Sequence, residues 1–478
     1  WPIQGGRSLE RKWVLSFPRS LTQLEKNSAI VNEEISRAKN LIARKDLQRA
    51  AQRLRLARTV PGHHHNPAII SLWNRLGSLG GQKLKLTSFR CIQTLSGHKG
   101  CVSSVELTPD ENHVVSSGHD GTLRIWNLSN GHCERILKGH KHIVNTISIT
   151  PDGYYLVSGS GSKNIHPTWA VEDNSVRLWN LENGSYLGVL GKHAGPVTAV
   201  STLPDGHYVI SGSSDATLRL WNLTSGKCVR IFTGHKEAIR DVSSTPDGRY
   251  IISVSKDDTI RLCEMSSGKH FILGKQQGAY TVAITPNGRY ALSGGACGLH
   301  FHLQPLQLWE LSTGQRLQTF KNKHSIFTVA VFSEGNHVIS GKTLQLWDIK
   351  DSHCTSTLPE HNLGVTSIAI TDNGHYAILG TTDGLVSVWE LDWDYEFPPP
   401  ADWEEGAQPC LEIFLTLHTP YSPDGLNHVG KRTWTDADFQ QLLTELGYRG
   451  YGWLRPEGGR RELEKIARDW QGPPSLQD

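Results

Sequence analysis

Residues 193–221 read HAGPVTAVSTLPDGHYVISGSSDATLRLW, and the plan of this stretch recurs along the chain. His193 opens it, a Pro-Asp-Gly turn follows at 204–206, and alternating apolar residues lead to Trp221. Alternation with a period of two is typical of half-buried β-strands, and Pro-Asp-Gly is a turn sequence. The stretch therefore predicts short strands joined by tight turns.

Seven units of this kind follow one another. Their third predicted strands end at Trp126, Trp179, Trp221, Cys263, Trp309, Trp347 and Trp389. The interval from His98 to His140 is 42 residues, and so is the interval from His193 to His235. A four-stranded sheet of this length cannot bury both of its faces alone. We therefore expect each unit to stack radially against its neighbours.

The period, the Gly-His pairs, the Pro-Asp-Gly turns and the recurring Trp resemble the WD-repeat (WD40) family of β-propellers. The resemblance covers residues 86–397 and implies a mainly β fold, a closed seven-bladed propeller with small α-helical regions at both ends. A spare strand at 89–95 precedes the first Gly-His, whereas residues 392–400 are acidic and Pro-rich and offer no clear outer strand. In this family the leading strand completes the last blade, so we expect 89–95 to close the ring.

The resemblance assigns the repeated polar residues to a buried network that joins loop to strand within each blade. The residue types suit this role, because Asp accepts from His, His accepts from a hydroxyl, and an indole N–H donates. The matching positions are His98, Asp120 and Trp126; His140, Asp173 and Trp179; His193, Asp215 and Trp221; and His361, Asp383 and Trp389. A catalytic role for these residues is the less favoured alternative.

Three blades depart from the pattern. Cys263 replaces the Trp of the fourth blade although Asp257 remains, and Lys275 stands where the fifth blade should have its His. The sixth blade drops the Asp turn at 340–343. We expect polar bonding to hold these blades less firmly, through drift or through reshaping for a partner.

Partners of the family most often meet the face that bears the residues three and five after the His and the one before the turn Asp. Carried over position by position, the partner-binding candidates include His119, Asn145, Glu172, Arg240, Lys256, Tyr280 and Phe327. Arg240, Lys256, Tyr280 and Phe327 lie along one arc of blades four to six. Exposed aromatic residues with Arg are typical of an interface hot spot. We expect the arc to bind an acidic or mixed peptide surface; ordinary surface side chains are the alternative.

Residues 1–85 predict a basic helical arm. Before Thr87 there are 16 Lys and Arg against 5 acids. Apolar spacing predicts helices over 20–58, broken at 45–46, and over 67–76. The first two resemble a degenerate tetratricopeptide hairpin. Arginines of the arm, such as Arg44 and Arg53, could meet nucleic acid or lipid, but a solvated helix face is favoured.

Residues 398–478 predict a small C-terminal helical domain. Thr435 caps a helix over 436–446, a second helix covers 460–470, and 411–417 is a short apolar segment. This tail resembles one that follows the propeller in certain bacterial multidomain WD-repeat proteins. Its helices are expected to dock on the propeller or on a sister chain.

The composition argues against a membrane-spanning helix and against a zinc ribbon. No run of 18 apolar residues occurs, and the eight cysteines show no CxxC spacing that would suggest a zinc ribbon. We expect a cytoplasmic protein without cofactor or metal, although His166, His300 and His302 lie in inserts where a metal is conceivable. The favoured function is a non-enzymatic protein–protein interaction scaffold for a protein partner of unknown identity. The alternatives are the sensory or regulatory half of a longer bacterial signalling enzyme, a kinase or NTPase with its catalytic part before residue 1; a propeller enzyme; and, least favoured, nucleic-acid binding.

Overall fold

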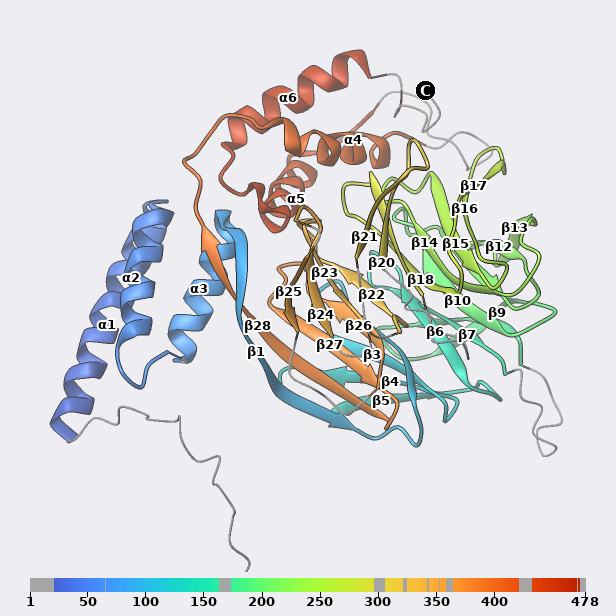
Figure 1. The fold of residues 1–478 in the computed structure, drawn as a ribbon, viewed down its shortest axis with the longest axis horizontal. Helices are drawn as coiled ribbons and strands as arrows, with labels where there is room; N and C mark the ends of the chain where they lie inside the picture. Colours follow the sequence, from blue (N-terminus) through green and yellow to red (C-terminus); the bar gives the residue numbers. More distant parts are fainter. Residues whose placement is uncertain are drawn as a thin grey trace, which may run out of the picture.

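Short antiparallel strands make up most of the chain, arranged around a central axis, with helices at both ends of the sequence (Figure 1). The structure is a computed structural model and describes residues 21–64, 66–162, 173–295, 306–320, 325–341, 344–351, 353–357, 364–420, 432–470 and 472. The strands form seven four-stranded sheets, each running from an inner to an outer strand. The predicted mainly β, closed seven-bladed propeller is confirmed.

The first four blades use consecutive strands of the chain. Blade 1 has β2 Val102–Leu107, β3 His113–Gly118, β4 Thr122–Asn127 and β5 Cys133–Lys138. Blade 2 has β6 Val144–Ile149, β7 Tyr155–Ser160, β8 Ser175–Asn180 and β9 Tyr186–Lys192. Blade 3 has β10 Val197–Thr202, β11 Tyr208–Ser213, β12 Leu218–Asn222 and β13 Lys227–Phe232. Blade 4 has β14 Ile239–Ser244, β15 Tyr250–Ser255, β16 Thr259–Glu264 and β17 His270–Lys275.

The remaining blades complete the circle. Blade 5 has β18 Ala279–Ile284, β19 Tyr290–Gly295, β20 Leu306–Glu310 and β21 Arg316–Phe320. Blade 6 has the shorter strands β22 Val329–Val331, β23 His337–Ser340, β24 Gln345–Asp348 and β25 His353–Thr357. Blade 7 has β26 Val365–Ile370, β27 Tyr376–Thr381 and β28 Leu385–Glu396, and its outer strand is β1 Gln82–Ser96 from the start of the repeat array.

The pairing of β1 with β28 closes the ring. The two strands run antiparallel, with Leu95 opposite Val386 and Gln82 opposite Glu396. Leu95 then packs with Val102 and Trp126 of the first blade, so that the two ends of the array share one apolar core. The pairing is longer than the sequence predicts. Residues 392–400 supply no outer strand, as expected, but β28 itself continues to Glu396, with buried apolar residues at 391, 393 and 395.

Apolar faces of neighbouring blades bury one another. Val157 and Leu178 of blade 2, for example, pack with Val200, Val209 and Trp221 of blade 3. Complete burial of a Val or Leu side chain stabilises by about 1.5 to 3 kcal/mol, and each seam buries several. The propeller therefore derives its cohesion from contacts between blades, as stacked repeats do.

Among the described residues, three helices precede the propeller: α1 Leu21–Ala43, α2 Leu47–Thr59 and α3 Pro67–Gly80. Asp46 and Asn66 cap α2 and α3, with their side chains accepting from backbone N–H groups. α1 and α2 form a hairpin whose contact is lined by small residues, among them Ala38, Ala50 and Ala57. The predicted third helix extends four residues further, to Gly80.

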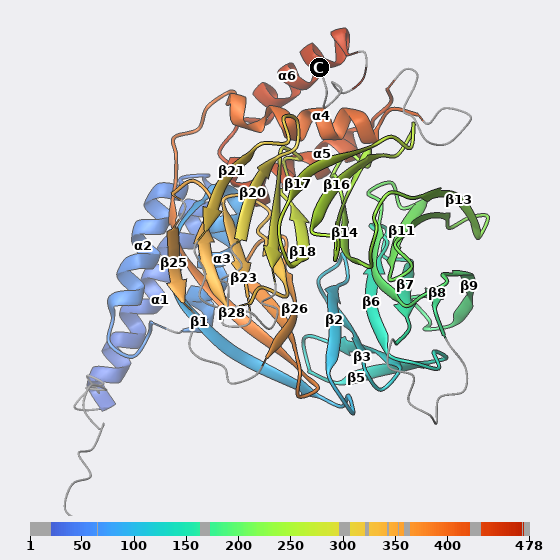
Figure 2. The same cartoon turned by 45° about the vertical axis from the view of Figure 1, so that its right-hand side comes forward.

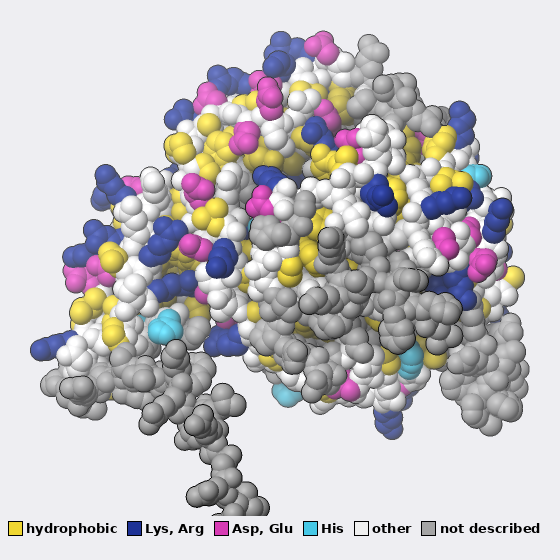
Figure 3. Space-filling model, in the orientation of Figure 1, with side chains coloured by type: hydrophobic (Ala, Val, Ile, Leu, Met, Phe, Trp, Pro, Cys, Tyr) yellow, Lys and Arg dark blue, Asp and Glu magenta, His cyan; other side chains and the backbone are white. Residues whose placement is uncertain are grey.

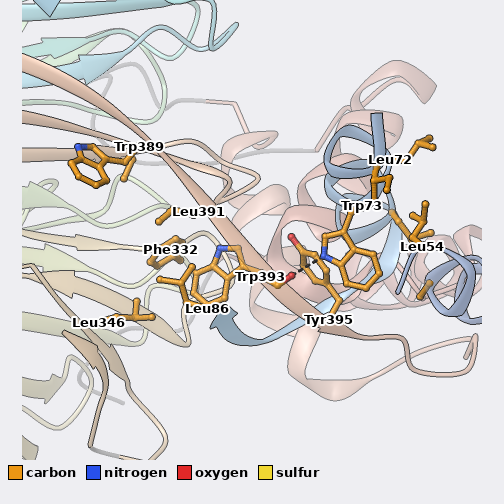
Figure 4. Packing of buried hydrophobic residues seen from close by; sticks show 14 of the residues in the cluster. Leu54, Leu72, Trp73, Leu86, Phe332, Leu346, Trp389, Leu391, Trp393 and Tyr395 are labelled. Carbon is orange, nitrogen blue, oxygen red and sulfur yellow. Dashed lines mark hydrogen bonds between the residues drawn. The ribbon is translucent and has the colours of Figure 1, made fainter. Parts of the chain in front are cut away.

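The helices are anchored on the extension of β28 (Figure 4). The indole N–H of Trp73 donates to the Trp393 carbonyl at 2.8 Å, and its ring lies 5.7 Å from that of Tyr395. Gly77 lets α3 approach so closely that a Cβ there would lie 2.4 Å from the Tyr395 ring. The boundary expected at residue 85 falls inside β1, so arm and seventh blade share a strand.

Much of the arm's positive charge is paired. Arg55 and Arg58 bond Asp394 and Asp392 of β28, and Arg37 and Arg53 lie beside Glu34. Basic and acidic side chains accordingly alternate over these helices in Figure 3. The acidic stretch after Trp389 is therefore the counter-charge of the arm.

The C-terminal residues form a second helical unit with its own core. It consists of α4 Gln408–Leu417, α5 Asp436–Leu446, the π-helical turn η2 Gly447–Tyr451 and α6 Pro456–Asp469. Thr435 and Asp438 form a capping box at the predicted start of α5. Phe414, Phe439 and Leu463 are buried together. The apolar segment 411–417 is part of helix α4. One expectation needs correction: the last helix begins at Pro456 instead of residue 460, because proline suits a first helical turn.

This C-terminal unit lies across one end of the propeller channel (Figure 2). Ile413 and Leu417 of α4 and Tyr448 and Arg449 of η2 face a ring of turn prolines across a cavity of about 510 Å³. The prolines are Pro151, Pro204, Pro246 and Pro286. We call this end of the propeller the turn face.

A buried ionic cluster joins the arm to the sixth blade. Lys83 of β1 lies 2.7 Å from Glu334, whose other carboxylate oxygen lies 2.9 Å from His337 Nδ1. Both Lys83 and Glu334 are only 6% exposed. The Lys83 ammonium also lies over the rings of Phe332 and Trp393. Although burial raises the pKa of Glu334, Lys83 and His337 lower it to about 2.

Replacing Glu334 by Gln should lower the free energy of unfolding at pH 7 by about 3 kcal/mol, because Lys83 stays buried without a counter-charge. The folded-state pKa lies below the ordinary value of 4.5, so the stabilisation is present above pH 4.5 and is lost as the pH falls toward 2. Denaturant unfolding at pH 7 and at pH 3 measures both effects. Glu462→Gln, which removes a surface pair with Lys465, should change stability by at most about 0.5 kcal/mol. Equal stability of Glu334→Gln and wild type at pH 7 would contradict this role.

Candidate functional site

The first three blades contain the same hydrogen-bonded chain. In blade 1 the His98 Nδ1 lies 3.1 Å from Asp120, the His98 Nε2 lies 2.8 Å from Ser116 Oγ, and the Trp126 indole donates to the same Oγ at 2.8 Å. Blade 2 repeats this with His140, Asp173, Ser158 and Trp179, and blade 3 repeats it with His193, Asp215, Ser211 and Trp221. The structure thus brings together nine of the predicted network residues.

Electrostatics fix the direction of each bond. Burial raises the pKa of Asp120, but N–H groups of Lys99 and Thr122 and the Thr122 hydroxyl outweigh it and lower the pKa to about 2. An ionised carboxylate only accepts, so His98 donates from Nδ1 and accepts the Ser116 hydroxyl at Nε2. Burial also lowers the pKa of His98, which favours this neutral imidazole. All polar side-chain atoms of this hydrogen-bonded network in blade 1 are therefore satisfied.

This geometry does not suit catalysis by the network. Ser116, Ser158 and Ser211 are fully buried, so a substrate cannot reach their hydroxyls. Each Oγ is also occupied twice, donating to a His and accepting from a Trp. A serine nucleophile needs an accessible Oγ beside its base.

The network changes in the later blades. Blade 4 keeps His235, Asp257 and Ser253 with Cys263 buried in place of Trp. In blade 5 the side chain that takes the place of the His is Gln276, whose amide oxygen accepts from Ser293, while Trp309 donates to Ser293. The prediction that Lys275 occupies this position is wrong, because β17 ends at Lys275 and the buried residue is the next one.

In blades 6 and 7 the described residues show fewer of these bonds, and His324, which precedes blade 6, lies outside them. Trp347 donates to Ser340 in blade 6, and Trp389 donates to Ser387 of its own strand in blade 7, where Leu379 stands in place of the buried serine. Asp383 accepts from Thr381. His361 lies outside the described residues.

The central channel opens opposite the turn face in a mouth of about 690 Å³. We call this end the mouth face. Six of the predicted partner-binding residues line it: His119, Asn145, Arg240, Lys256, Tyr280 and Phe327. Glu172 lies outside the described residues. Burial lowers the pKa of His119, so this mouth residue is neutral at pH 7.

One equivalent position at the mouth end of each blade carries two different kinds of side chain. In blades 1, 2, 3 and 7 it carries Ser103, Asn145, Thr198 and Thr366. Thr198 Oγ1, for example, lies 3.1 Å from the Gly212 carbonyl of its own blade and 2.9 Å from the Ile239 carbonyl of the next. Asn145 gives one N–H to Gly161 and the other to Val197, both at 2.8 Å. We call these four side chains the seam residues, because each ties its blade to the following one.

The same position in blades 4, 5 and 6 carries Arg240, Tyr280 and Phe327, which stack on one another instead. The Arg240 guanidinium lies 5.2 Å from the Tyr280 ring centroid, and the rings of Tyr280 and Phe327 meet edge to face at 5.1 Å. Phe327 is 36% exposed despite its size. Sequence alone did not separate these residues from the seam residues, since only their neighbours in space distinguish the two roles.

The described residues contain no group of three His, Cys, Asp or Glu side chains that could hold a metal ion. The insert histidines His166, His300 and His302 lie outside those residues. None of the described helices is long and apolar enough to cross a membrane.

Comparison with known proteins agrees with the repeat pattern. The family model for the WD domain, G-beta repeat, matches residues 89–127, 131–180, 184–222, 226–264 and 352–390. The chain therefore carries WD40 repeats, and they build a seven-bladed propeller. The matches leave out residues 265–351, which include most of blades 5 and 6.

Similar curated proteins come from plants and fungi. The guanine nucleotide-binding protein subunit beta of Arabidopsis thaliana is 28% identical over 128 residues, 26% of this chain and 32% of that protein. The nuclear distribution protein PAC1 of Arthroderma otae is 27% identical over 187 residues, 34% of this chain and 40% of that protein. The nuclear distribution protein nudF of Emericella nidulans is 58% identical over 41 residues, 8% of this chain and 9% of that protein.

The chain thus aligns with less than half the length of each of these relatives, all eukaryotic. The bacterial resemblance of the C-terminal tail is not supported by them.

Replacing Ser211 by Ala should destabilise the propeller by about 2 kcal/mol, because it leaves the Trp221 indole N–H and the His193 Nε2 buried without partners. Ser225→Ala, in an exposed turn of the same blade, is the matched control and should leave stability within about 0.5 kcal/mol of wild type. Thermal and denaturant unfolding measure both variants. Two equally stable variants would show that the chain of bonds adds nothing.

Replacing the seam residue Thr198 by Val keeps its shape and removes its hydroxyl. The variant should lose about 1 kcal/mol of stability, because the bond between blades 3 and 4 disappears. Lys256→Ala at the same mouth should change stability by at most about 0.5 kcal/mol. If Thr198→Val unfolds at the wild-type denaturant concentration, the seam role is wrong.

Proposed function

We propose that this chain is a non-enzymatic protein-interaction scaffold that binds a protein partner on the mouth face of its propeller. WD40 propellers are typically non-enzymatic scaffolds that bind proteins, and the relatives named above share these repeats. Our proposal for this chain goes further, because it commits to one face and to one arc of residues on it.

The observation that carries the proposal is the stack of Arg240, Tyr280 and Phe327 at positions where four other blades hold seam residues. Seam residues spend their polar atoms on backbone carbonyls of the ring. The stacked residues do not, so their charge and aromatic surface are directed to the mouth. Arg and aromatic side chains around a concave centre are the composition of an interface hot spot.

The opposite face supports this choice. The C-terminal unit lies over the turn face, where Ser333 donates to the Tyr448 carbonyl and α4 faces the turn prolines. A partner approaching that end would first meet helices α4 to α6. Among the described parts of the propeller, the mouth face carries no such cover.

Rigidity adds to the expected affinity. Arg240 and Tyr280 lie on the inner strands β14 and β18, which are paired within their blades, and Asn145 and Thr198 tie other inner strands across the seams. Little conformational entropy remains to be lost when a partner binds such a surface. The propeller would therefore act as a preformed platform.

The other predicted functions have less support. Buried network serines argue against a propeller enzyme built on those residues. The regulatory half of a longer bacterial kinase or NTPase stays a prediction, which sequence before residue 1 would test. We also propose a cytoplasmic location, because the seven described cysteines are all free thiols, as in reducing compartments.

The triple variant Arg240→Ala, Tyr280→Ala and Phe327→Ala should lose the partner, since hot-spot truncations cost about 2 kcal/mol or more each. Wild type and variant are immobilised and exposed to a lysate of the host cell, and retained proteins are quantified by mass spectrometry. The matched control carries Arg135→Ala, Val229→Ala and Ile231→Ala on exposed outer strands. A protein retained by wild type and control but depleted at least about tenfold by the triple variant supports the proposal. Identical retention by all three would sink it.

A further inference from the structure

We infer that Arg240 is a carboxylate receptor: it binds the side chain of an Asp or Glu in an extended, acidic segment of the partner protein. This inference rests on the proposed function and names the chemistry that the mouth face recognises. It concerns how the side chains of Arg240, Tyr280 and Phe327 are arranged to bind that group.

The stack on Tyr280 fixes the guanidinium and leaves its edge available. Its centre lies over the Tyr280 ring, 5.2 Å from the ring centroid, so the ring covers one side of the group. A cation–π contact uses the face of a guanidinium, whereas its N–H donors project from the edge. Within the described residues Arg240 makes no ion pair. Two parallel N–H groups held in this way match the two oxygens of a carboxylate.

The Tyr280 ring is itself held in place. Phe327 meets it edge to face, with an angle of 89° between the ring planes. Arg240, Tyr280 and Phe327 therefore support one another in a row along three blades. Because this row orders the Arg240 side chain before a ligand arrives, less rotamer entropy is lost on binding.

The local charge balance favours an anion. Among the described residues that line the mouth, Arg240 and Lys256 are the cations and Asp241 is the acid. The Lys256 backbone N–H donates to the carbonyl of Ala238, which places the second cation on the loop beside the strand of Arg240.

Asp241 does not neutralise Arg240. Its carboxylate accepts from the Thr281 hydroxyl and from the Val282 N–H, both at 2.9 Å, and so reaches sideways to the inner strand of blade 5. Burial raises the pKa of Asp241. The same contacts tie blade 4 to blade 5, where the seam residue is missing.

The supply of donors suits a carboxylate better than a phosphate. Hydroxyl and amide groups of Ser103, Asn145, Thr198 and Thr366 already donate to backbone carbonyls. The charged donors at the arc, among the described residues, are the guanidinium of Arg240 and the ammonium of Lys256. A carboxylate has two oxygens to satisfy, whereas a phosphate has three and carries a larger charge. The exposed Phe327 beside the cations favours an apolar residue next to the acidic one.

Three synthetic hexapeptide pools test this inference. All peptides carry an acetylated amino end and an amidated carboxyl end. Five positions hold uncharged residues, and one internal position is fixed as Glu, Gln or phosphoserine, which defines the three pools. With blocked ends, the Glu pool has a single carboxylate per peptide. Fluorescence anisotropy with the complete chain should show the Glu pool binding about tenfold more tightly than the Gln pool, since a charge-assisted bond contributes on that scale.

Variants locate the receptor. Arg240→Lys should weaken binding of the Glu pool about fivefold or more, because an ammonium lacks the paired donors, and should leave the Gln pool unchanged. Tyr280→Leu, which removes the ring face, should also weaken the Glu pool. Arg135→Ala, on the exposed outer strand of blade 1, should have no effect on either pool.

The outcomes separate this inference from the proposed function. If the Glu pool has no advantage over the Gln pool, or does not bind, the carboxylate receptor is wrong, and a partner still lost by the triple alanine variant would leave the proposed function standing. Tighter binding of the phosphoserine pool than of the Glu pool would also overturn the choice of carboxylate. Retention of the partner by the triple alanine variant would overturn the proposed function itself.

Discussion

The pairing of β1 with β28 is the constraint on which the rest of the molecule depends. It brings the first strand of the repeat array to the outer edge of the last blade and places Leu95 in one core with Val102 and Trp126. An open array would leave the faces of two terminal blades in water. Closure instead buries every blade between two neighbours and fixes the positions of the inner strands around the mouth. The arc and the seam residues have defined places only because the ring is shut.

The flanking helices support the part of the ring where the repeat has decayed. Among the described residues the blade networks are complete in blades 1 to 3 and show fewer bonds in blades 5 to 7, and blade 6 has the shortest strands. The arm and the C-terminal unit both reach this region, through Lys83 to Glu334 and through the Tyr448 carbonyl to Ser333. The Trp73 contact with Trp393 adds an apolar anchor on blade 7. Blades 6 and 7 are thus braced from outside by the arm and the C-terminal unit.

Most of the architecture could be predicted from the sequence because the repeat is written in local signals. Turn residues, alternating apolar positions and the recurring Trp predict blades, and a surplus strand at 89–95 predicts closure. The extension of β28 could not be predicted in this way, since residues 392–400 are acidic and Pro-rich and only the arm supplies the counter-charges of Asp392 and Asp394. Gln276 was missed because the fifth blade is one residue shorter at this point, and only burial reveals which side chain bonds Ser293. Seam and arc residues share one sequence position, so contacts between blades were needed to tell them apart.

Native-state hydrogen exchange tests the closed ring most directly. If closure makes the seven blades one cooperative unit, amides of β26 to β28 in the seventh blade should exchange as slowly as those of β10 to β12 in the third, both through global unfolding. Exchange in the seventh blade that is faster by orders of magnitude, with the third blade still protected, would mean that the ring opens where its ends meet and would contradict the account given above.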